Sequence, residues 1–190
     1  MIRVAITPVE IFEEEVAFIT TILDAGWNYV HLRHPEASID EMRQLIDSID
    51  SKYHNRLKLH DNFELVEEFK LGGVHLNRRN SIAPDDFNGG ISKSCHTIGE
   101  IEASHNFDYI TLSPIFDSIS KEGYNATFSN EELMRVKYSD KVVALGGITP
   151  LTATKLNEYE FIGYAVLGYL FNSPDITTLE NRLNKFEIIK

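Results

Sequence analysis

The sequence contains a single cysteine, Cys95, among 190 residues, so an internal disulfide is excluded. A lone thiol is typical of a reducing compartment, and we therefore expect a cytoplasmic protein. No apolar run approaches the ~20 residues that a membrane span requires, which predicts no membrane partner. Met1–Val4 leads directly into an expected strand, so we also expect no signal peptide.

Positive charge is scarce, with 18 Lys and Arg against 29 Asp and Glu and a net charge of -11. This balance excludes a nucleic-acid partner, because contacts to phosphate dominate such binding and need a basic surface. The carboxylates concentrate in expected helices, whereas arginines and histidines follow expected strands. The distribution predicts an acidic body with a locally positive mouth, which suits a small phosphorylated ligand.

Strand-like apolar runs alternate with helix-like stretches and no linker interrupts them. We expect helices at 13–25, 38–51, 62–71, just after Thr97, 129–138 and 176–186, and strands at 2–7, 29–32, 57–60, 74–76, 91–94, 108–112, 142–145 and 161–167. The pattern predicts an α/β fold, a compact (β/α)8 TIM barrel in one domain over 1–190, with a short fourth βα unit. A doubly wound open sheet is the alternative, although the first βα turn lacks its Gly-x-Gly.

Two expected strands near the C-terminus end in glycine. Gly146 and Gly147 follow the strand at 142–145, with Thr149 as a helix N-cap, and Gly168 follows the strand at 161–167. Glycine between a strand and a helix N-terminus leaves backbone N–H groups open to an oxyanion. The pair predicts a phosphate site in the loops after strands seven and eight of a barrel. The alternative is that these glycines only turn the chain.

Polar residues at the other strand ends are candidates for chemistry, because barrel active sites lie there. Arg33 can hold a phosphate or pyrophosphate bidentately, or else pair with Glu36. Asp61 can bind Mg²⁺ through oxygen, or else cap the following helix. Lys121 lies in a long loop that can close as a lid and stabilise a departing pyrophosphate, or else is a surface lysine.

Three histidines end successive expected strands, His31, His60 and His75. With Asp61 they suit a zinc site, which would favour a hydrolase. The alternative for His75 is a hydrogen-bonded interior residue. Cys95 and His96 are neighbours on a strand and point to opposite faces, so they do not form a nucleophile and its base.

Seven short segments occur in a fixed order along the chain: Val30-His31-Leu32-Arg33, His60-Asp61, Gly73-Val74-His75-Leu76, Ser94-Cys95-His96-Thr97, Asp108-Tyr109-Ile110, Ser113–Phe116 with Ser118–Lys121, and Leu145-Gly146-Gly147-Ile148. Together they resemble the thiamine-phosphate synthase family, which also contains the TenI-type thiazole tautomerases. The resemblance covers nearly the whole chain, from Val30 to Leu170. It implies a transferase that joins hydroxymethylpyrimidine pyrophosphate to thiazole phosphate and releases pyrophosphate in thiamine biosynthesis.

The resemblance also implies roles for individual residues. Arg33 and Lys121 would be catalytic and, with Ser94, would face the pyrimidine pyrophosphate, while Asp61 and the position of Asn80 would hold Mg²⁺. His31 and His60 occupy substrate-binding positions. The thiazole phosphate would be held by Ser118, Ser120, Gly146, Gly147, Leu167 and Gly168. We predict that Gly147→Asp abolishes phosphate affinity and leaves the fold intact. An acidic barrel of this size is also compatible with a homodimer.

The chain departs from the family pattern at the pyrophosphate and metal end. His31 stands where the family has Gln, Pro35 where it has Lys, His60 where it has Asn, and Asn80 where it has the second metal carboxylate. Arg78 or Arg79 can replace the lost positive charge without metal. The tautomerase alternative has its own gap, because Pro114 stands at its acid/base histidine and His31, His60 or His96 would have to serve. A non-catalytic phosphate binder is the third hypothesis.

Overall fold

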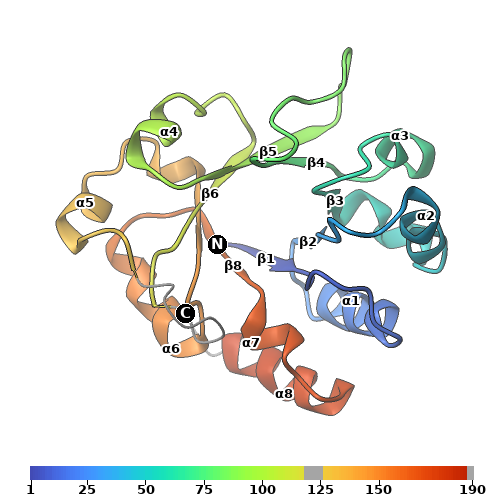
Figure 1. Cartoon of the computed structure of the whole chain (residues 1–190). Coiled ribbons are helices and arrows are strands. Elements are labelled where there is room, and N and C mark those ends of the chain that lie inside the picture. Colours follow the sequence, from blue (N-terminus) through green and yellow to red (C-terminus); the bar gives the residue numbers. More distant parts are fainter. Residues whose placement is uncertain (118–125, 188–190) are drawn as a thin grey trace.

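A computed structural model describes residues 1–117 and 126–187 of the chain. Eight parallel strands close into a barrel in chain order, and helices lie outside it (Figure 1). The (β/α)8 prediction is therefore confirmed, with each expected strand present. The strands are β1 Ile2–Ile6, β2 Tyr29–Leu32, β3 Leu57–Leu59, β4 Gly73–Leu76, β5 Gly90–Cys95, β6 Tyr109–Leu112, β7 Val142–Leu145 and β8 Gly163–Val166.

Most of the expected helices are shorter than the sequence pattern indicates, although the helix expected at 176–186 is confirmed as Ile176–Glu187. No described helix is long and apolar enough to cross a membrane. No helix lies between β4 and β5, where every residue is described, so the short fourth unit is confirmed. The α-helices are α1 Glu15–Asp24, α2 Ile39–Asp47, α3 Leu65–Phe69, α4 Ile98–Glu102, α5 Asn130–Met134, α6 Pro150–Ala153, α7 Gly168–Phe171 and α8 Ile176–Glu187, and the 3₁₀ segments are η1 Ser51–Arg56, η2 Ser139–Lys141 and η3 Thr154–Glu158.

Local sequence fixes several helix starts. Ser38, Thr97 and Ser129 each accept a hydrogen bond from the backbone N–H three residues on, and a glutamate there returns a bond to the cap. These capping boxes satisfy N–H groups that a helix cannot pair internally. Helix α3 departs from expectation, because it begins at Leu65 with Glu64 as N-cap. The interpretation of Asp61 as a helix cap is therefore wrong.

The barrel interior divides into an apolar and a polar half. Side chains of β1, β7 and β8 form an apolar cluster that includes Val4, Val143 and Ala165. Strands β2 to β6 instead bury polar side chains, while their alternate residues such as Val30 join the large core under the helices. The buried polar residues on these strands and their ends are His31, Lys58, His60, His75, Ser92 and Thr111. Barrel interiors are usually filled by bulky branched residues, so this half marks the candidate site.

Candidate functional site

His31 lies at the centre of the polar half. Its Nδ1 is 3.0 Å from Nε2 of His60, and its Nε2 is 2.5 Å from the Tyr109 hydroxyl. Burial raises the pKa of the Tyr109 phenol well above its ordinary value, so the phenol stays protonated. A phenol hydroxyl can donate or accept, so the tautomer of His31 sets the direction of both of these bonds.

His75 extends this network toward β5. Its Nδ1 and Nε2 each lie 2.9 Å from a serine hydroxyl, that of Ser92 and that of Ser94 respectively. Its ring stacks on His60 with centroids 4.3 Å apart. The geometry matches the interpretation of His75 as a hydrogen-bonded interior residue, and it also holds Ser94, a proposed substrate contact, at the end of β5.

All three imidazoles are neutral at ordinary pH. Burial lowers the pKa of His31 and His60 well below the usual value and that of His75 to about 3, with the charge of Lys58 adding to the effect at His31 and His75. One ring nitrogen from each of these histidines lies within 4.8 Å of the others. Most of their ring nitrogens already hold hydrogen bonds to one another, to Tyr109 or to serines. The zinc hypothesis therefore stays a prediction, and metal analysis of the purified protein tests it.

Asp61, directly after β3, is held by side chains from the loop that follows β4. The Arg79 guanidinium contacts both carboxylate oxygens, with Nη2 3.2 Å from Oδ1 and 3.1 Å from Oδ2. The Asn80 amide nitrogen lies 2.7 Å from Oδ1 and 3.0 Å from the backbone oxygen of His60. Both of these partners are acceptors, so the amide must present its nitrogen to Asp61.

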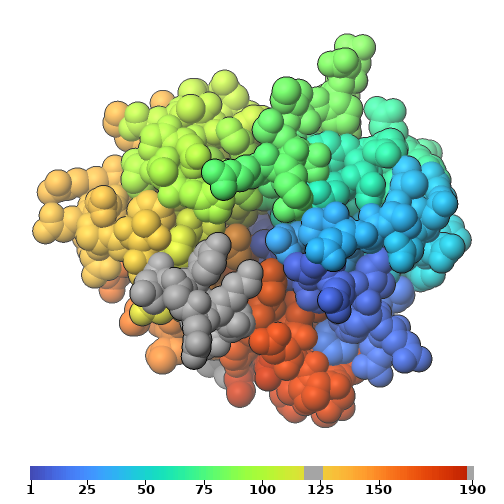
Figure 2. Space-filling model, in the orientation of Figure 1, coloured from blue at the N-terminus to red at the C-terminus, as the bar shows by residue number. Residues whose placement is uncertain are grey.

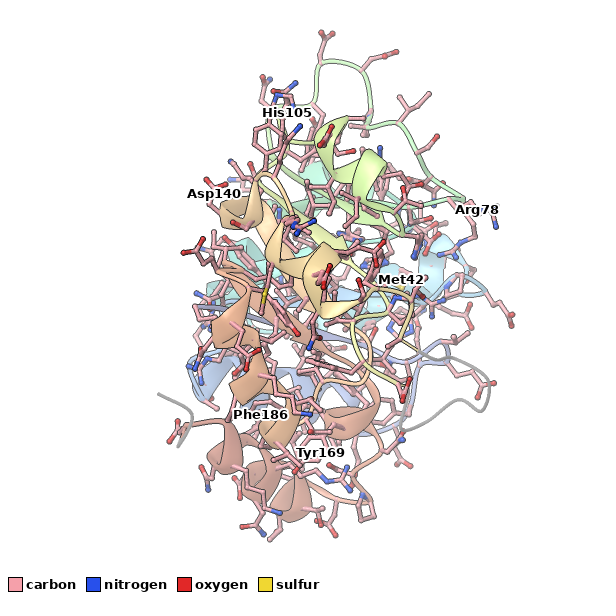
Figure 3. The ribbon with its side chains drawn as sticks, turned by 90° about the vertical axis from the view of Figure 1, so that its left-hand side faces the viewer. Met42, Arg78, His105, Asp140, Tyr169 and Phe186 are labelled. Atoms are coloured by element: carbon pink, nitrogen blue, oxygen red, sulfur yellow. The ribbon has the colours of Figure 1, made fainter. Side chains whose placement is uncertain are left out.

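Hydrogen bonds of the Asn77 side chain hold the loop after β4 in the conformation that brings Arg79 and Asn80 to Asp61. The Asn77 side-chain oxygen accepts hydrogen bonds from the backbone N–H groups of Arg79 and Asn80, at 2.9 and 3.2 Å. Its amide nitrogen donates to the backbone oxygen of His60 at 2.8 Å, which fixes the turn against the end of β3. Arg79 is thereby aimed at Asp61, whereas the neighbouring Arg78 points away at the edge of the molecule (Figure 3).

Arg33 follows β2 at the same mouth and is half-buried. Its backbone N–H donates to the Thr7 hydroxyl at 2.8 Å, which anchors the turn. Among the described residues no hydrogen bond or ion pair engages its guanidinium, so the pairing with Glu36 is absent there. Burial lowers the Arg33 pKa, the nearby charge of Arg79 lowers it further, and that of Asp61 raises it. A half-buried guanidinium that no described residue engages is suited to bind an anion.

The two glycines after β7 adopt positive φ, +95° at Gly146 and +65° at Gly147. A Cβ on Gly147 would lie 2.3 Å from the backbone oxygen of Asp117, and one on Gly146 would lie 2.9 Å from Pro114. The expectation that Gly147→Asp leaves the fold intact is therefore wrong, because any side chain strains this turn. Gly147 still presents a backbone N–H that no described hydrogen bond occupies.

The loop after β8 supplies the other half of the expected phosphate site. Leu145 of β7 pairs with Ala165 of β8, so the two strands end side by side. Leu167 is the N-cap of α7 and Gly168 its first residue, which leaves the Gly168 N–H aimed out of the helix start. In the space-filling view the surface is hollowed near the centre of the face that the strand ends surround (Figure 2).

Comparison with known proteins identifies the barrel. The family model described as thiamine monophosphate synthase matches residues 4–170. The chain belongs to this family. A crystal structure of thiamine phosphate pyrophosphorylase from Bacteroides thetaiotaomicron is similar at 32% identity and a TM-score of 0.89, covering 100% of this chain and 97% of that one.

Two curated thiamine-phosphate synthases show the same likeness at lower identity. That of Methanobrevibacter smithii is 26% identical over 92% of this chain and 91% of its own length. That of Latilactobacillus sakei is 29% identical over 70% of this chain, and the match spans 64% of the relative's length. A thiamine phosphate pyrophosphorylase structure from Pyrococcus furiosus, at 18% identity and a TM-score of 0.74, shows the shared fold.

The Mg²⁺ that the family resemblance implies does not fit the side chains present. Mg²⁺ demands oxygen ligands in octahedral geometry, with carboxylates foremost. Here Asp61 has both oxygens engaged by Arg79, and Asn80 presents an amide nitrogen where a second carboxylate would supply oxygen. A divalent cation that approached Asp61 would be repelled by the positive charge of the Arg79 guanidinium, which already contacts the carboxylate. The Mg²⁺ expectation remains a prediction that these donors disfavour.

The structure brings together most of the thiamine monophosphate synthase positions named from sequence. Arg33, Asp61 and Asn80 lie at one side of the mouth with His31, His60 and Ser94 beneath, and the glycine turns complete the other side. Ser118, Ser120 and Lys121 lie outside the described residues. The sequence did not indicate that Tyr109 bonds to His31 or that the charge of Lys58 lowers the pKa of His31 and His75. The alternation of residues along a strand does not show which of its two faces will bury polar side chains inside the barrel.

Proposed function

We propose that this chain is a thiamine-phosphate synthase, a transferase that joins hydroxymethylpyrimidine pyrophosphate to thiazole phosphate and releases pyrophosphate. The observation that carries the proposal is the half-buried guanidinium of Arg33, with which no described residue pairs, at the mouth of a barrel of this family. Arg33 follows β2, and only β1 separates β2 from β8, the strand that leads to Gly168. Two separate anion sites at one mouth suit two phosphorylated substrates.

The role proposed for each residue follows from the hydrogen-bonding groups or charge that it presents at the mouth of the barrel. Arg33 binds the pyrophosphate, and His31, His60 and Ser94 bound the pyrimidine side through neutral hydrogen-bonding groups. The backbone N–H groups at Gly147 and Gly168, with Gly146 and Leu167 shaping the turns, bind the thiazole phosphate. For Ser118, Ser120 and Lys121 the proposal rests on the family resemblance. Catalysis here is electrostatic stabilisation of a charged leaving group, so no protein nucleophile is required.

Incubation of purified protein with both substrates tests this function. We expect thiamine phosphate and pyrophosphate to appear in equal amounts, and neither to appear when one substrate is omitted. Binding of thiazole phosphate without any product contradicts the synthase. That result favours the tautomerase-like isomerase or the binder, and conversion of a thiazole phosphate isomer then separates those two.

Gly168→Asp replaces Gly147→Asp as the test of the phosphate site. Gly168 is the first residue of α7 and lacks positive φ, so a side chain is compatible with its backbone. The new carboxylate would repel the phosphate, and we expect KM for thiazole phosphate to rise by about tenfold or more. Gly99→Asp is the control, because a Cβ at Gly99 meets nothing within 4 Å. Equal KM values for the two variants would show that the phosphate binds elsewhere.

The same proposal carries three coarser expectations. A synthase acting on small phosphorylated heteroaromatic substrates fits a cytoplasmic protein, and the buried, free Cys95 is compatible with that compartment. A single domain over 1–190 and a homodimer are the remaining predictions. Light scattering of the purified chain tests the dimer, and a monomer mass at every protein concentration would contradict it.

A further inference from the structure

The loop between β4 and β5 places a guanidinium where a metal would meet Asp61. Arg79 holds both oxygens of that carboxylate, and Arg33 lies close enough for the charge of Arg79 to lower its pKa. Asp61 neutralises one of these two cations. The pair of arginines is therefore left with one net positive charge at the mouth, and no described ion pair compensates it.

We propose that Arg79 and Arg33 form a pyrophosphate clamp that takes the place of a divalent cation. This inference rests on the proposed function and names the groups that serve its leaving group. Guanidinium groups present planar forks of N–H donors that match phosphate oxygens bidentately and stay charged at every working pH. Asp61 acts as a positioning residue, because its carboxylate fixes the direction in which Arg79 presents its remaining N–H donors.

The exposed fractions of Arg79 and Asp61 are consistent with these two roles. The Arg79 side chain is 46% exposed while its Asp61 partner is 16% exposed, so part of the guanidinium remains open to a ligand. Arg33 comes from β2, whose Leu32 lies beside Leu59 of β3, the strand that leads into Asp61. The segment after β2 and the segment after β4 meet on one face of the molecule (Figure 2). An anion at this point can reach both.

The transfer step balances without a metal or a proton donor. The bond between the pyrimidine methylene carbon and the pyrophosphate oxygen breaks, and its electron pair leaves with the pyrophosphate. The thiazole nitrogen lone pair forms the new C–N bond to the same carbon. The two guanidinium groups stabilise the negative charge that develops on the leaving oxygens, which is the role of preorganised donors in such sites. No oxidant, reductant or further reactant is needed.

Binding of inorganic pyrophosphate, measured calorimetrically in EDTA, tests the clamp independently of activity. We expect the unaltered protein to bind and Arg79→Met to bind at least about tenfold more weakly, the effect of losing a charge-assisted bidentate contact. Arg78→Met is the matched control, since it removes the same charge from the same loop and Arg78 points away (Figure 3). We expect its affinity to change by less than about threefold. Equal weakening in both variants, or binding only when Mg²⁺ is present, would overturn the clamp.

A turnover measurement in EDTA separates this inference from the proposed function. Product formation that persists in EDTA and falls in Arg79→Met supports both. Product that requires Mg²⁺ overturns the clamp and keeps the synthase. If no product forms under either condition, the synthase fails, and the pyrophosphate affinities above still decide whether Arg79 and Arg33 form an anion site.

Discussion

His31 and His60 share a hydrogen bond of 3.0 Å between Nδ1 and Nε2 inside the barrel, where both rings are buried. The bond requires one nitrogen to donate and the other to accept, so the accepting ring must stay neutral. Protonation of that ring replaces its acceptor nitrogen by a donor and breaks the bond. The stability of the barrel is therefore linked to pH through residues that also border the proposed substrate site.

Acid should destabilise this protein well before its carboxylates titrate. The folded-state pKa of His75 is lowered to about 3, below the value of 6.5 for an unperturbed histidine. The unfolded chain therefore binds the proton more readily, so the stabilisation is complete above pH 6.5 and is lost as the pH falls toward 3. We expect His75 alone to remove about 2 kcal/mol of unfolding free energy between about pH 7.5 and about pH 5.

Urea unfolding at these two pH values measures the effect. His75→Asn lacks the titrating ring, so we expect its stability to be lower at neutral pH and to depend less on pH than that of the unaltered protein. An identical pH dependence in the two proteins would show that His75 does not resist protonation.

Tyr109→Phe should destabilise the barrel through the loss of one buried hydrogen bond. The Tyr109 hydroxyl lies 2.5 Å from Nε2 of His31, and the variant leaves that buried nitrogen without this hydrogen-bond partner. Such a loss costs about 1–3 kcal/mol. Tyr29→Phe is the control, because Tyr29 stacks on Tyr109 with ring centroids 5.8 Å apart and no described hydrogen bond uses its hydroxyl. Similar thermal midpoints for the two variants would contradict the network.

The effect of a glycine-to-alanine substitution on stability should depend on the φ angle at that position and on the space available to the new Cβ. Gly147→Ala forces a Cβ into a turn at φ +65° with a carbonyl oxygen 2.3 Å away, and we expect a loss of about 2–3 kcal/mol. Gly99→Ala lies in α4 with open space around it and should stabilise by about 0.4–1 kcal/mol. Denaturant midpoints measure both. A neutral Gly147→Ala would mean that the turn after β7 can relax.

Glu15 and His34 form a pair under the loop that carries Arg33. Nε2 of His34 lies 2.9 Å from Oε1 of Glu15, and both side chains are fully buried. Removing Glu15 leaves His34 with only the Thr7 hydroxyl and the Val9 backbone oxygen as polar partners among the described residues, so Glu15→Ala should cost about 1–3 kcal/mol. Glu14→Ala alters an exposed neighbour and should leave stability unchanged. Thermal unfolding of the two variants decides, and a tolerated Glu15→Ala would show that the pair contributes little.

Local signals predicted the elements of this fold well. Apolar runs located the eight strands, and the motifs beginning at Ser38, Thr97 and Ser129 gave capped helices. Except for α8, helix lengths were overestimated because capping and periodicity mark where a helix can begin, whereas tertiary packing decides how far it continues. The helix expected from Asn62 begins at Leu65, since Asp61 is engaged by Arg79 and Asn62 adopts φ +52°.

The candidate site was only partly accessible to sequence. Arg33 and the glycine turns could be named because their positions after strands are sequence properties. The partner of Asp61 could not, since Arg79 reaches it across 18 residues of chain through a turn that Asn77 organises. The glycines at 146 and 147 also have a structural cause, the close approach of Pro114 and Asp117, that no local pattern reveals.

The sequence by itself determined the barrel, because strand and helix periodicity and capping act over a few residues. It also determined the family, through short segments in a fixed order. Only the tertiary structure decided that His31, His60 and His75 form one neutral network and that Arg79 occupies Asp61. Those relationships arise when strand ends distant in the chain are brought to one mouth, where burial and charge act over a few ångströms regardless of sequence separation.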